Sequence, residues 1–169
     1  MKSRNEFGTI LDRNFFCRRA TVVARELLGQ WLVHGDLRAQ IFETEAYLPE
    51  GDEAAHAYVG RTKRTEVIFG PPGHAYVYLN YGIHFMLNVV VEEEGVPGCV
   101  LIRGAGEWRG PGRLTRGMGI ALSHYGVDLT RGDLTIRRGQ NIPDENVLRT
   151  PRIGIRKSSE MLLRFLIAP

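Results

Sequence analysis

The chain is poor in cysteine and in long apolar runs, and each shortage excludes a class of protein. Its two cysteines, Cys17 and Cys99, lie far apart in dissimilar contexts. Neither a disulfide framework nor a CxxC metal site is therefore predicted, and we expect two buried thiols. No stretch approaches the roughly 20 apolar residues that span a bilayer, and the N-terminal segment lacks the apolar centre of a secretory signal. We expect a soluble, cytoplasmic protein without membrane contact.

Motifs for metals and nucleotide cofactors are also missing. The histidines form no HxxxH pair and no set with the cysteines, so no metal site is predicted. The glycine-rich pieces FGPPGH and RGPGRLTRG match neither a phosphate-binding Walker loop nor GxGxxG. We expect no metal, no nucleotide cofactor and no other cofactor.

The remaining composition favours one compact domain over residues 1–169. The chain is 43% hydrophobic and has no repeats, low-complexity tracts or linkers, so it can bury one core. Short β-rich runs separated by turns predict an α+β fold with a curved, mainly antiparallel sheet, a barrel-like core, few helices and a protruding hairpin. We expect helices within 20–29 and 110–122, an irregular segment over 48–73, and a hairpin of strands 74–80 and 83–91 joined by Tyr81 and Gly82.

Positive charge is carried almost entirely by arginine and gathers in the second part of the chain. Of the 22 basic residues 19 are arginine. Residues 103–169 hold twelve basic against six acidic residues, and residues 1–102 hold ten against thirteen. Arginine presents a planar fork of donors that suits phosphate oxygens. The pattern therefore fits either a nucleic-acid surface or an ordinary solvated face.

Two carboxylates in IFETEAY are the first candidates for chemistry. On a strand Glu43, Glu45 and Tyr47 share one face, with the two acids about 6.6 Å apart along the chain. The segment could be a polar outer face, or one carboxylate could act as a general base on water. A spacing near 6.5 Å would also suit the paired acids of an inverting carbohydrate glycosidase. His56, on the polar loop beyond, is by itself more typical of a bracing residue than of a ligand.

Taken in order, several segments resemble the alkyladenine (3-methyladenine) DNA glycosylase family, from about Phe15 to Phe165. They are ETEAY (43–47), DEAAHAY (52–58), GRT (60–62), FGPPGHAYVYLNYGIHFMLNVV (69–90), CVLIRGA (99–105), GPGRL (110–114) and PRIGI (151–155), followed by LRF (163–165). In that family a damaged purine is flipped out of the duplex and its N-glycosidic bond is hydrolysed. The resemblance implies the same for this chain, for alkylated or deaminated purines such as 3-methyladenine, hypoxanthine and ethenoadenine.

The resemblance also implies catalytic roles. Glu45 corresponds to the family's general base, which activates water, and Glu43 becomes a supporting residue. Arg103 and Ile153 correspond to positions that help to hold the nucleophilic water, Ile153 through its backbone carbonyl. With water as the nucleophile no Schiff base forms, so a lyase activity is not expected.

Further positions correspond to groups that bind the flipped base or the duplex. Tyr47, Tyr78 and His56 would enclose the base, and Asn88 would disfavour guanine at the pocket mouth. Tyr81, at the hairpin tip, would fill the gap left in the duplex, while Tyr76 packs in the sheet. Thr62, Arg64 and Arg113 would contact the DNA backbone, although Thr65 stands where the family usually has asparagine. We expect a monomer acting on double-stranded DNA; the alternative is a non-catalytic binder of damaged DNA.

Overall fold

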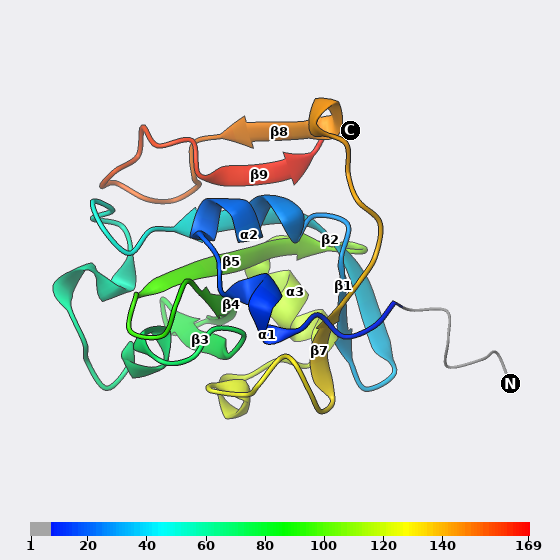
Figure 1. Ribbon diagram of the computed structural model, residues 1–169, viewed down its shortest axis with the longest axis horizontal. Helices are drawn as coiled ribbons and strands as arrows, with labels where there is room; N and C mark the ends of the chain where they lie inside the picture. Colours follow the sequence, from blue (N-terminus) through cyan, green and yellow to red (C-terminus); the bar gives the residue numbers. More distant parts are fainter. Residues whose placement is uncertain (1–7) are drawn as a thin grey trace, which may run out of the picture.

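The fold is built on one curved antiparallel sheet (Figure 1), in a computed structural model that describes residues 8–169. Its strands follow the order β3, β4, β5, β2, β1, β7, while β6 pairs with β5, β9 with β2, and β8 with β9. The sheet curls into a half-barrel, which confirms the predicted α+β class. The strands are β1 (Trp31–His34), β2 (Leu37–Tyr47), β3 (Ala75–Asn80), β4 (His84–Val91), β5 (Gly98–Ala105), β6 (Trp108–Arg109), β7 (Leu134–Arg137), β8 (Val147–Thr150) and β9 (Arg164–Ile167).

Alternation along the central strands assigns one face to the core and the other to a pocket. Thr44 and Ala46 of β2 are fully buried, and the Thr44 hydroxyl donates to the carbonyl of Ala24 in the helix packed on that face, at 2.7 Å. Val100 and Ile102 of β5 belong to the same core. The alternate side chains of β5, Leu101 and Arg103, line a cavity on the opposite face. The period of two residues thus separates packing from chemistry.

The helices are short. Three α-helices are described, α1 (Arg13–Phe16), α2 (Ala20–Glu26) and α3 (Pro111–Met118), with 3₁₀ turns η1 (His56–Val59), η2 (Glu66–Phe69), η3 (Leu122–His124) and η4 (Asp144–Asn146). α2 packs on β2 and β5, and α3 packs on β4 and β5. Within residues 8–169 no helix has the length and apolar character of a membrane span.

The structure corrects several boundaries. α2 ends at Glu26, before the predicted end at Gly29, because residues 27–29 form a turn. The hairpin connection is three residues long rather than two: Asn80 pairs with His84, so Ile83 joins the loop. The prediction of two buried thiols holds for Cys99 and is wrong for Cys17, which is exposed.

Candidate active site

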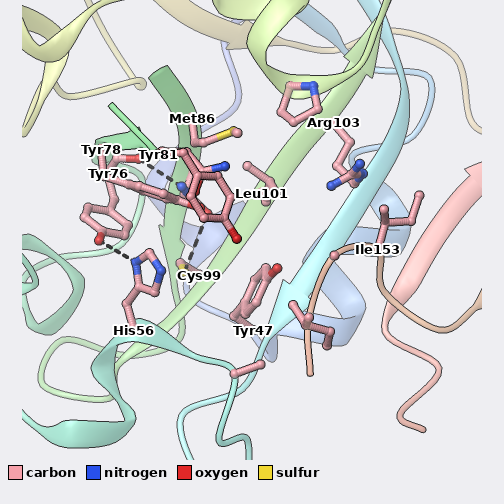
Figure 2. Close-up of a pocket in the computed structure, with 16 residues that line it drawn as sticks. Tyr47, His56, Tyr76, Tyr78, Tyr81, Met86, Cys99, Leu101, Arg103 and Ile153 are labelled. Atoms are coloured by element: carbon pink, nitrogen blue, oxygen red, sulfur yellow. Dashed lines mark hydrogen bonds between the residues drawn. The ribbon is translucent and has the colours of Figure 1, made fainter. Parts of the chain in front are cut away.

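A cavity of about 390 Å³ opens on the face of the sheet opposite the core (Figure 2). Side chains from β2, β3, β4 and β5 form its floor and walls, and residues from η1, the start of α3 and the 153–155 segment close it. It brings together seven residues predicted for the site, namely Tyr47, His56, Tyr78, Tyr81, Asn88, Arg103 and Ile153. The other lining residues are Ala54, Tyr76, Asn80, Met86, Cys99, Leu101, Pro111, Gly154 and Ile155.

Aromatic rings crowd one side of this cavity. Tyr76 and Tyr78 share a face of β3, as their parity predicts, and stack with centroids 5.4 Å apart at 30°. The His56 ring meets Tyr78 edge-on at 4.5 Å, and its Nδ1 atom lies 2.8 Å from the Tyr76 hydroxyl. Tyr76 therefore orients His56 in addition to packing in the sheet (Figure 2), a role that its position in sequence does not reveal. Tyr47, from β2, lines the same cavity.

Burial keeps the polar groups of this wall neutral. Desolvation, with a smaller contribution from the positive charge of Arg64, lowers the pKa of His56 to about 4. Desolvation raises the pKa of Tyr78 to about 12 and raises those of Tyr47 and Tyr76 still further. At neutral pH the cavity thus presents uncharged aromatic surfaces, which suit a flat heterocycle.

The lowered pKa of His56 makes folding stability depend on pH. The pKa of His56 is near 6.5 in the unfolded chain and about 4 in the folded one, so between these values the unfolded chain binds more protons. The contribution of His56 to the free energy of unfolding is therefore complete above pH 6.5 and is lost as the pH falls toward 4. We expect the free energy of unfolding to decrease by on the order of 2 kcal/mol from pH 7 to pH 4.5 because of this group, after discounting for partial exposure.

Urea unfolding of wild type and His56→Asn across this pH range measures the contribution of His56. The asparagine keeps a polar partner for Tyr76 but does not titrate, so its stability should fall less steeply with pH. If the free energy of unfolding falls equally with pH in both proteins, His56 does not titrate as described.

Glu45 lies behind the cavity wall and is held by three donors. It is fully buried. Its Oε1 atom accepts a hydrogen bond from the Ile153 backbone N–H (2.8 Å) and lies 3.5 Å from Arg103 Nη1, while Oε2 accepts one from the Tyr47 hydroxyl (3.0 Å). All three donor residues line the cavity. The structure thus adds a contact through the amide of Ile153 to the role predicted for its carbonyl.

Glu43 is an ion-pair residue. The register of β2 against β5 is irregular on both sides of Glu43. The Glu43 carboxylate contacts two guanidinium groups. Its Oε1 accepts hydrogen bonds from Nε of Arg164 (2.6 Å) and Nε of Arg103 (3.1 Å). A carboxylate fixed in this way does not serve as the general acid that a carbohydrate glycosidase with paired acids requires. Arg103 instead links the two acids, because it also contacts Glu45.

Asn88 is fixed at both ends of its amide. Its Nδ2 donates to the carbonyl of Tyr76 at 3.2 Å, and its Oδ1 lies 3.9 Å from the thiol of Cys99. Burial raises the pKa of that thiol to about 12, so Cys99 stays a neutral donor. Both residues line the cavity and are themselves buried, which gives the cavity a rigid, uncharged wall.

Comparison with known proteins identifies the family. The sequence model described as Methylpurine-DNA glycosylase (MPG) matches residues 14–108 and 106–169. A relative from Chlorobaculum tepidum is 38% identical over 94% of this chain and 87% of its own length. The chain belongs to the methylpurine-DNA glycosylase family.

Two other relatives are similar throughout their length. The one from Carboxydothermus hydrogenoformans is 41% identical over 94% of this chain and 95% of its own. The one from Chlorobium phaeobacteroides is 41% identical over 91% of this chain and 89% of its own. All three relatives carry the provisional name 3-methyladenine DNA glycosylase. As a member of this family the protein is a DNA N-glycosylase, and the resemblance noted in the sequence is confirmed.

The hairpin tip of this glycosylase carries exposed apolar side chains beside the cavity. Tyr81 is 87% exposed, with Ile83 at 68% and Leu79 at 47%. Tyr81 has a φ of 50°, a left-handed conformation that costs a non-glycine residue energy, and Gly82 follows at 66°. The tight turn thus presents a bulky ring at the rim of the cavity, as the resemblance implies for Tyr81.

The residues predicted to contact the DNA backbone do not line the cavity. Thr62 and Arg64 are exposed on the 60–65 loop, where Thr62 and the buried Thr65 exchange hydrogen bonds through their side chains and backbones. Thr65 also donates to the Gly60 carbonyl at 3.3 Å, so it braces the loop despite its departure from the family pattern. Arg113 is exposed on α3.

Sequence reasoning missed a second ion pair next to this glycosylase site. Arg152 and Asp52 are joined by two hydrogen bonds of 2.6 and 2.7 Å, and their side chains are fully buried. Arg152 belongs to the quoted PRIGI segment and Asp52 to DEAAHAY, but no periodicity links residues one hundred positions apart. In residues 8–169 no group of three or more His, Cys, Asp or Glu side chains is arranged to hold a metal ion.

Proposed function

We propose that the protein is a monofunctional DNA glycosylase that flips alkylated or deaminated purines out of duplex DNA and hydrolyses the N-glycosidic bond with water activated by Glu45. One observation carries this proposal: a buried carboxylate is held by three donors directly behind a cavity walled by neutral aromatic rings. A carboxylate in this setting can take a proton from water and can stabilise positive charge that develops on the sugar.

The contacts of Glu45 do not use all the acceptor positions of its carboxylate. A carboxylate accepts about four hydrogen bonds, and Glu45 has contacts from Ile153, Arg103 and Tyr47. Of these three residues only Tyr47 contacts Oε2, so Oε2 can also accept a hydrogen bond from the attacking water. Arg103 and the carbonyl of Ile153 would complete the site of that water. As the bond to the base breaks, the negative charge of Glu45 would stabilise the oxocarbenium-like sugar.

Water is the nucleophile in this proposal, because no amine lies in the described cavity. Neither Lys63 nor Lys157 lines it. An amine nucleophile would lead through a Schiff base to strand cleavage. The protein should therefore leave an abasic site in an uncut strand.

The aromatic groups account for binding of the base. The flipped purine would be enclosed by Tyr47 of β2, Tyr78 of β3 and His56 of η1. The fixed amide of Asn88 would exclude the exocyclic amino group of guanine. Flipping costs a few kcal/mol of stacking and pairing, least for a damaged base, and stacking on aromatic rings returns about 1–3 kcal/mol per base.

Arginines beside the cavity supply a path for the DNA backbone. Arg109, Arg113 and Arg116 border a groove that shares Met86 and Pro111 with the cavity. Among the described residues none of the three forms a salt bridge, so no carboxylate neutralises their charge, although Arg109 lies over the ring of Phe42 at 5.3 Å. Arg64 and Thr62, on the 60–65 loop, would contact another part of the backbone. Such contacts would position the duplex without reading its sequence.

The range of lesions is tested by single-turnover excision from matched duplexes. Each duplex carries 3-methyladenine, hypoxanthine, ethenoadenine or undamaged guanine at the same position. We expect excision of the first three, fastest for the cationic 3-methyladenine, whose base leaves without further protonation, and none of guanine. Failure to excise hypoxanthine and ethenoadenine would restrict the proposal to alkylated bases.

We expect Tyr81 to matter for excision from duplex DNA and not for excision from a single strand. We expect Tyr81→Ser to slow excision from a duplex by about tenfold or more, because it removes the ring that occupies the vacated space. Excision of the same lesion from a single strand, where no gap has to be filled, should change little. Equal losses on both substrates in a single-turnover assay would instead give Tyr81 a structural role.

A further inference from the structure

The buried pair of Arg152 and Asp52 joins two segments that meet at Glu45. Besides its two hydrogen bonds to Asp52, Arg152 donates to the carbonyl of Ala46 in β2 at 3.0 Å. Asp52 in turn accepts hydrogen bonds from the backbone N–H of Leu48 (2.9 Å) and of Ala54 (3.2 Å). The pair thus fastens the segment around Arg152 to the end of β2 and to the start of the 48–55 turn.

Such a pair is expensive to bury, which favours a role beyond stability. Removing two charges from water costs several kcal/mol per ion, and apolar residues of similar size often stabilise as well or better. Both side chains are fully buried, so neither can contact DNA. Their surroundings therefore have to explain why charged groups occupy these positions.

The guanidinium of Arg152 acts on two of the three donors that hold Glu45. It lies 4.6 Å from the centre of the Tyr47 ring, in cation–π contact, and the hydroxyl of that ring donates to Glu45 Oε2. Arg152 also directly precedes Ile153, whose backbone N–H donates to Glu45 Oε1. Fixing one guanidinium therefore fixes a ring and a peptide group whose donors reach the two different oxygens of the carboxylate.

We propose that Arg152, held by Asp52, is a positioning residue that sets the orientation of the Glu45 carboxylate through Tyr47 and Ile153. The inference rests on the proposed function, because the orientation of Glu45 matters for the rate only if Glu45 activates the water. Arg152 touches neither the base nor the reacting atoms. Its loss should affect the chemical step and leave binding of the lesion duplex nearly unchanged.

The test replaces the charged pair by a neutral one that keeps much of its shape. Asp52→Asn/Arg152→Met leaves no unpaired buried charge and retains one acceptor oxygen, which can serve one of the N–H groups of Leu48 and Ala54 that donate to the two oxygens of Asp52. Arg152→Lys is the second variant, since it keeps a cation for Asp52 but lacks the planar fork that binds both oxygens and lies against Tyr47. The control is Asp128→Asn/Arg13→Met, which removes an ion pair of 2.7 Å that contacts no residue lining the cavity.

For each variant, 3-methyladenine excision is followed with enzyme in excess, and the dissociation constant is measured on a duplex with a non-cleavable abasic analogue. We expect the neutral pair to lower the single-turnover rate constant by about 10²-fold, the cost of a displaced catalytic group, and Arg152→Lys by roughly tenfold on the same ground. The dissociation constants should stay within about threefold, and the control should excise at the wild-type rate. A merely structural role would lower the amplitude, which reports the folded fraction, and leave the rate constant unchanged.

Wild-type rate constants for the neutral pair and for Arg152→Lys would overturn the inference, as would a loss of binding as large as the loss of rate. Glu45→Gln, assayed in parallel, distinguishes a failure of the proposed function from a failure of the inference about Arg152. If it excises as fast as wild type, the proposed base is wrong. If it is slow while the Arg152 variants are fast, the inference alone fails. Combining the neutral pair with Glu45→Gln should add little further loss, because both changes act on one group.

Discussion

Glu45→Gln should lower the single-turnover rate of excision by about 10³-fold or more while the lesion duplex still binds. The amide cannot accept the proton of the attacking water, and it lacks the negative charge that stabilises the developing cation, effects worth about 10²–10⁴-fold and 10²–10³-fold in other enzymes. Binding is retained because Glu45 is fully buried and the aromatic walls are unchanged. Rates with enzyme in excess, together with dissociation constants from fluorescence anisotropy, measure the two effects separately.

Glu43→Gln is the matched control, since Glu43 lies on the same face of β2 but contacts Arg103 and Arg164 rather than Tyr47 or Ile153. We expect this variant to lose stability, with a much smaller loss of rate than Glu45→Gln. A larger loss of rate from Glu43→Gln than from Glu45→Gln would exchange the roles of the two acids.

Arg103→Met should damage both folding and chemistry. Arg103 bridges the two buried carboxylates, Glu43 at 3.1 Å and Glu45 at 3.5 Å. Its removal breaks a buried ion-pair network, which typically costs 3–5 kcal/mol. It also withdraws one of the donors that hold Glu45 and the water, so we expect the rate constant of the folded fraction to fall by about 10²-fold.

Arg164→Met separates these two effects. Arg164 also binds Glu43 Oε1, at 2.6 Å, and pairs with Glu45 in the β2–β9 ladder, but its side chain forms no hydrogen bond or ion pair with the Glu45 carboxylate. We expect urea unfolding to show that both variants are destabilised, and single-turnover rates to show that Arg103→Met alone is slow. Equal rate constants for the two variants would reduce Arg103 to a structural partner of Glu43.

Much of the fold could be predicted from alternation along the strands. The parity of Glu43, Glu45 and Tyr47, and that of Tyr76 and Tyr78, grouped side chains on one face of each strand, because side chains on a strand alternate. Of these residues the three tyrosines line the cavity. The antiparallel sheet followed from short strands joined by turns. Short elements such as β6, β8 and α1 were missed, because a strand or helix of two to four residues has too few positions to show a period.

The pairing of distant charges could not be predicted. Glu43 alternates with apolar residues in a way that fits a polar face or a catalytic acid equally, and only the fold places Arg164 against it. Asp52 and Arg152 resemble ordinary surface charges in the sequence, yet they are fully buried together. The residues around Glu45 were named through the resemblance to the family, and the geometry that connects them comes from the fold.

The central claim is that this cavity hydrolyses the glycosidic bond of a damaged purine. It is tested most directly by incubating wild-type protein with a duplex containing one 3-methyladenine and measuring the released base by chromatography alongside strand integrity before and after alkali. Our account predicts one free base per duplex, with the strand intact before alkali and cut at the lesion after it. Tight binding of the duplex without release of the base would show that the protein recognises damage without removing it and would contradict the account.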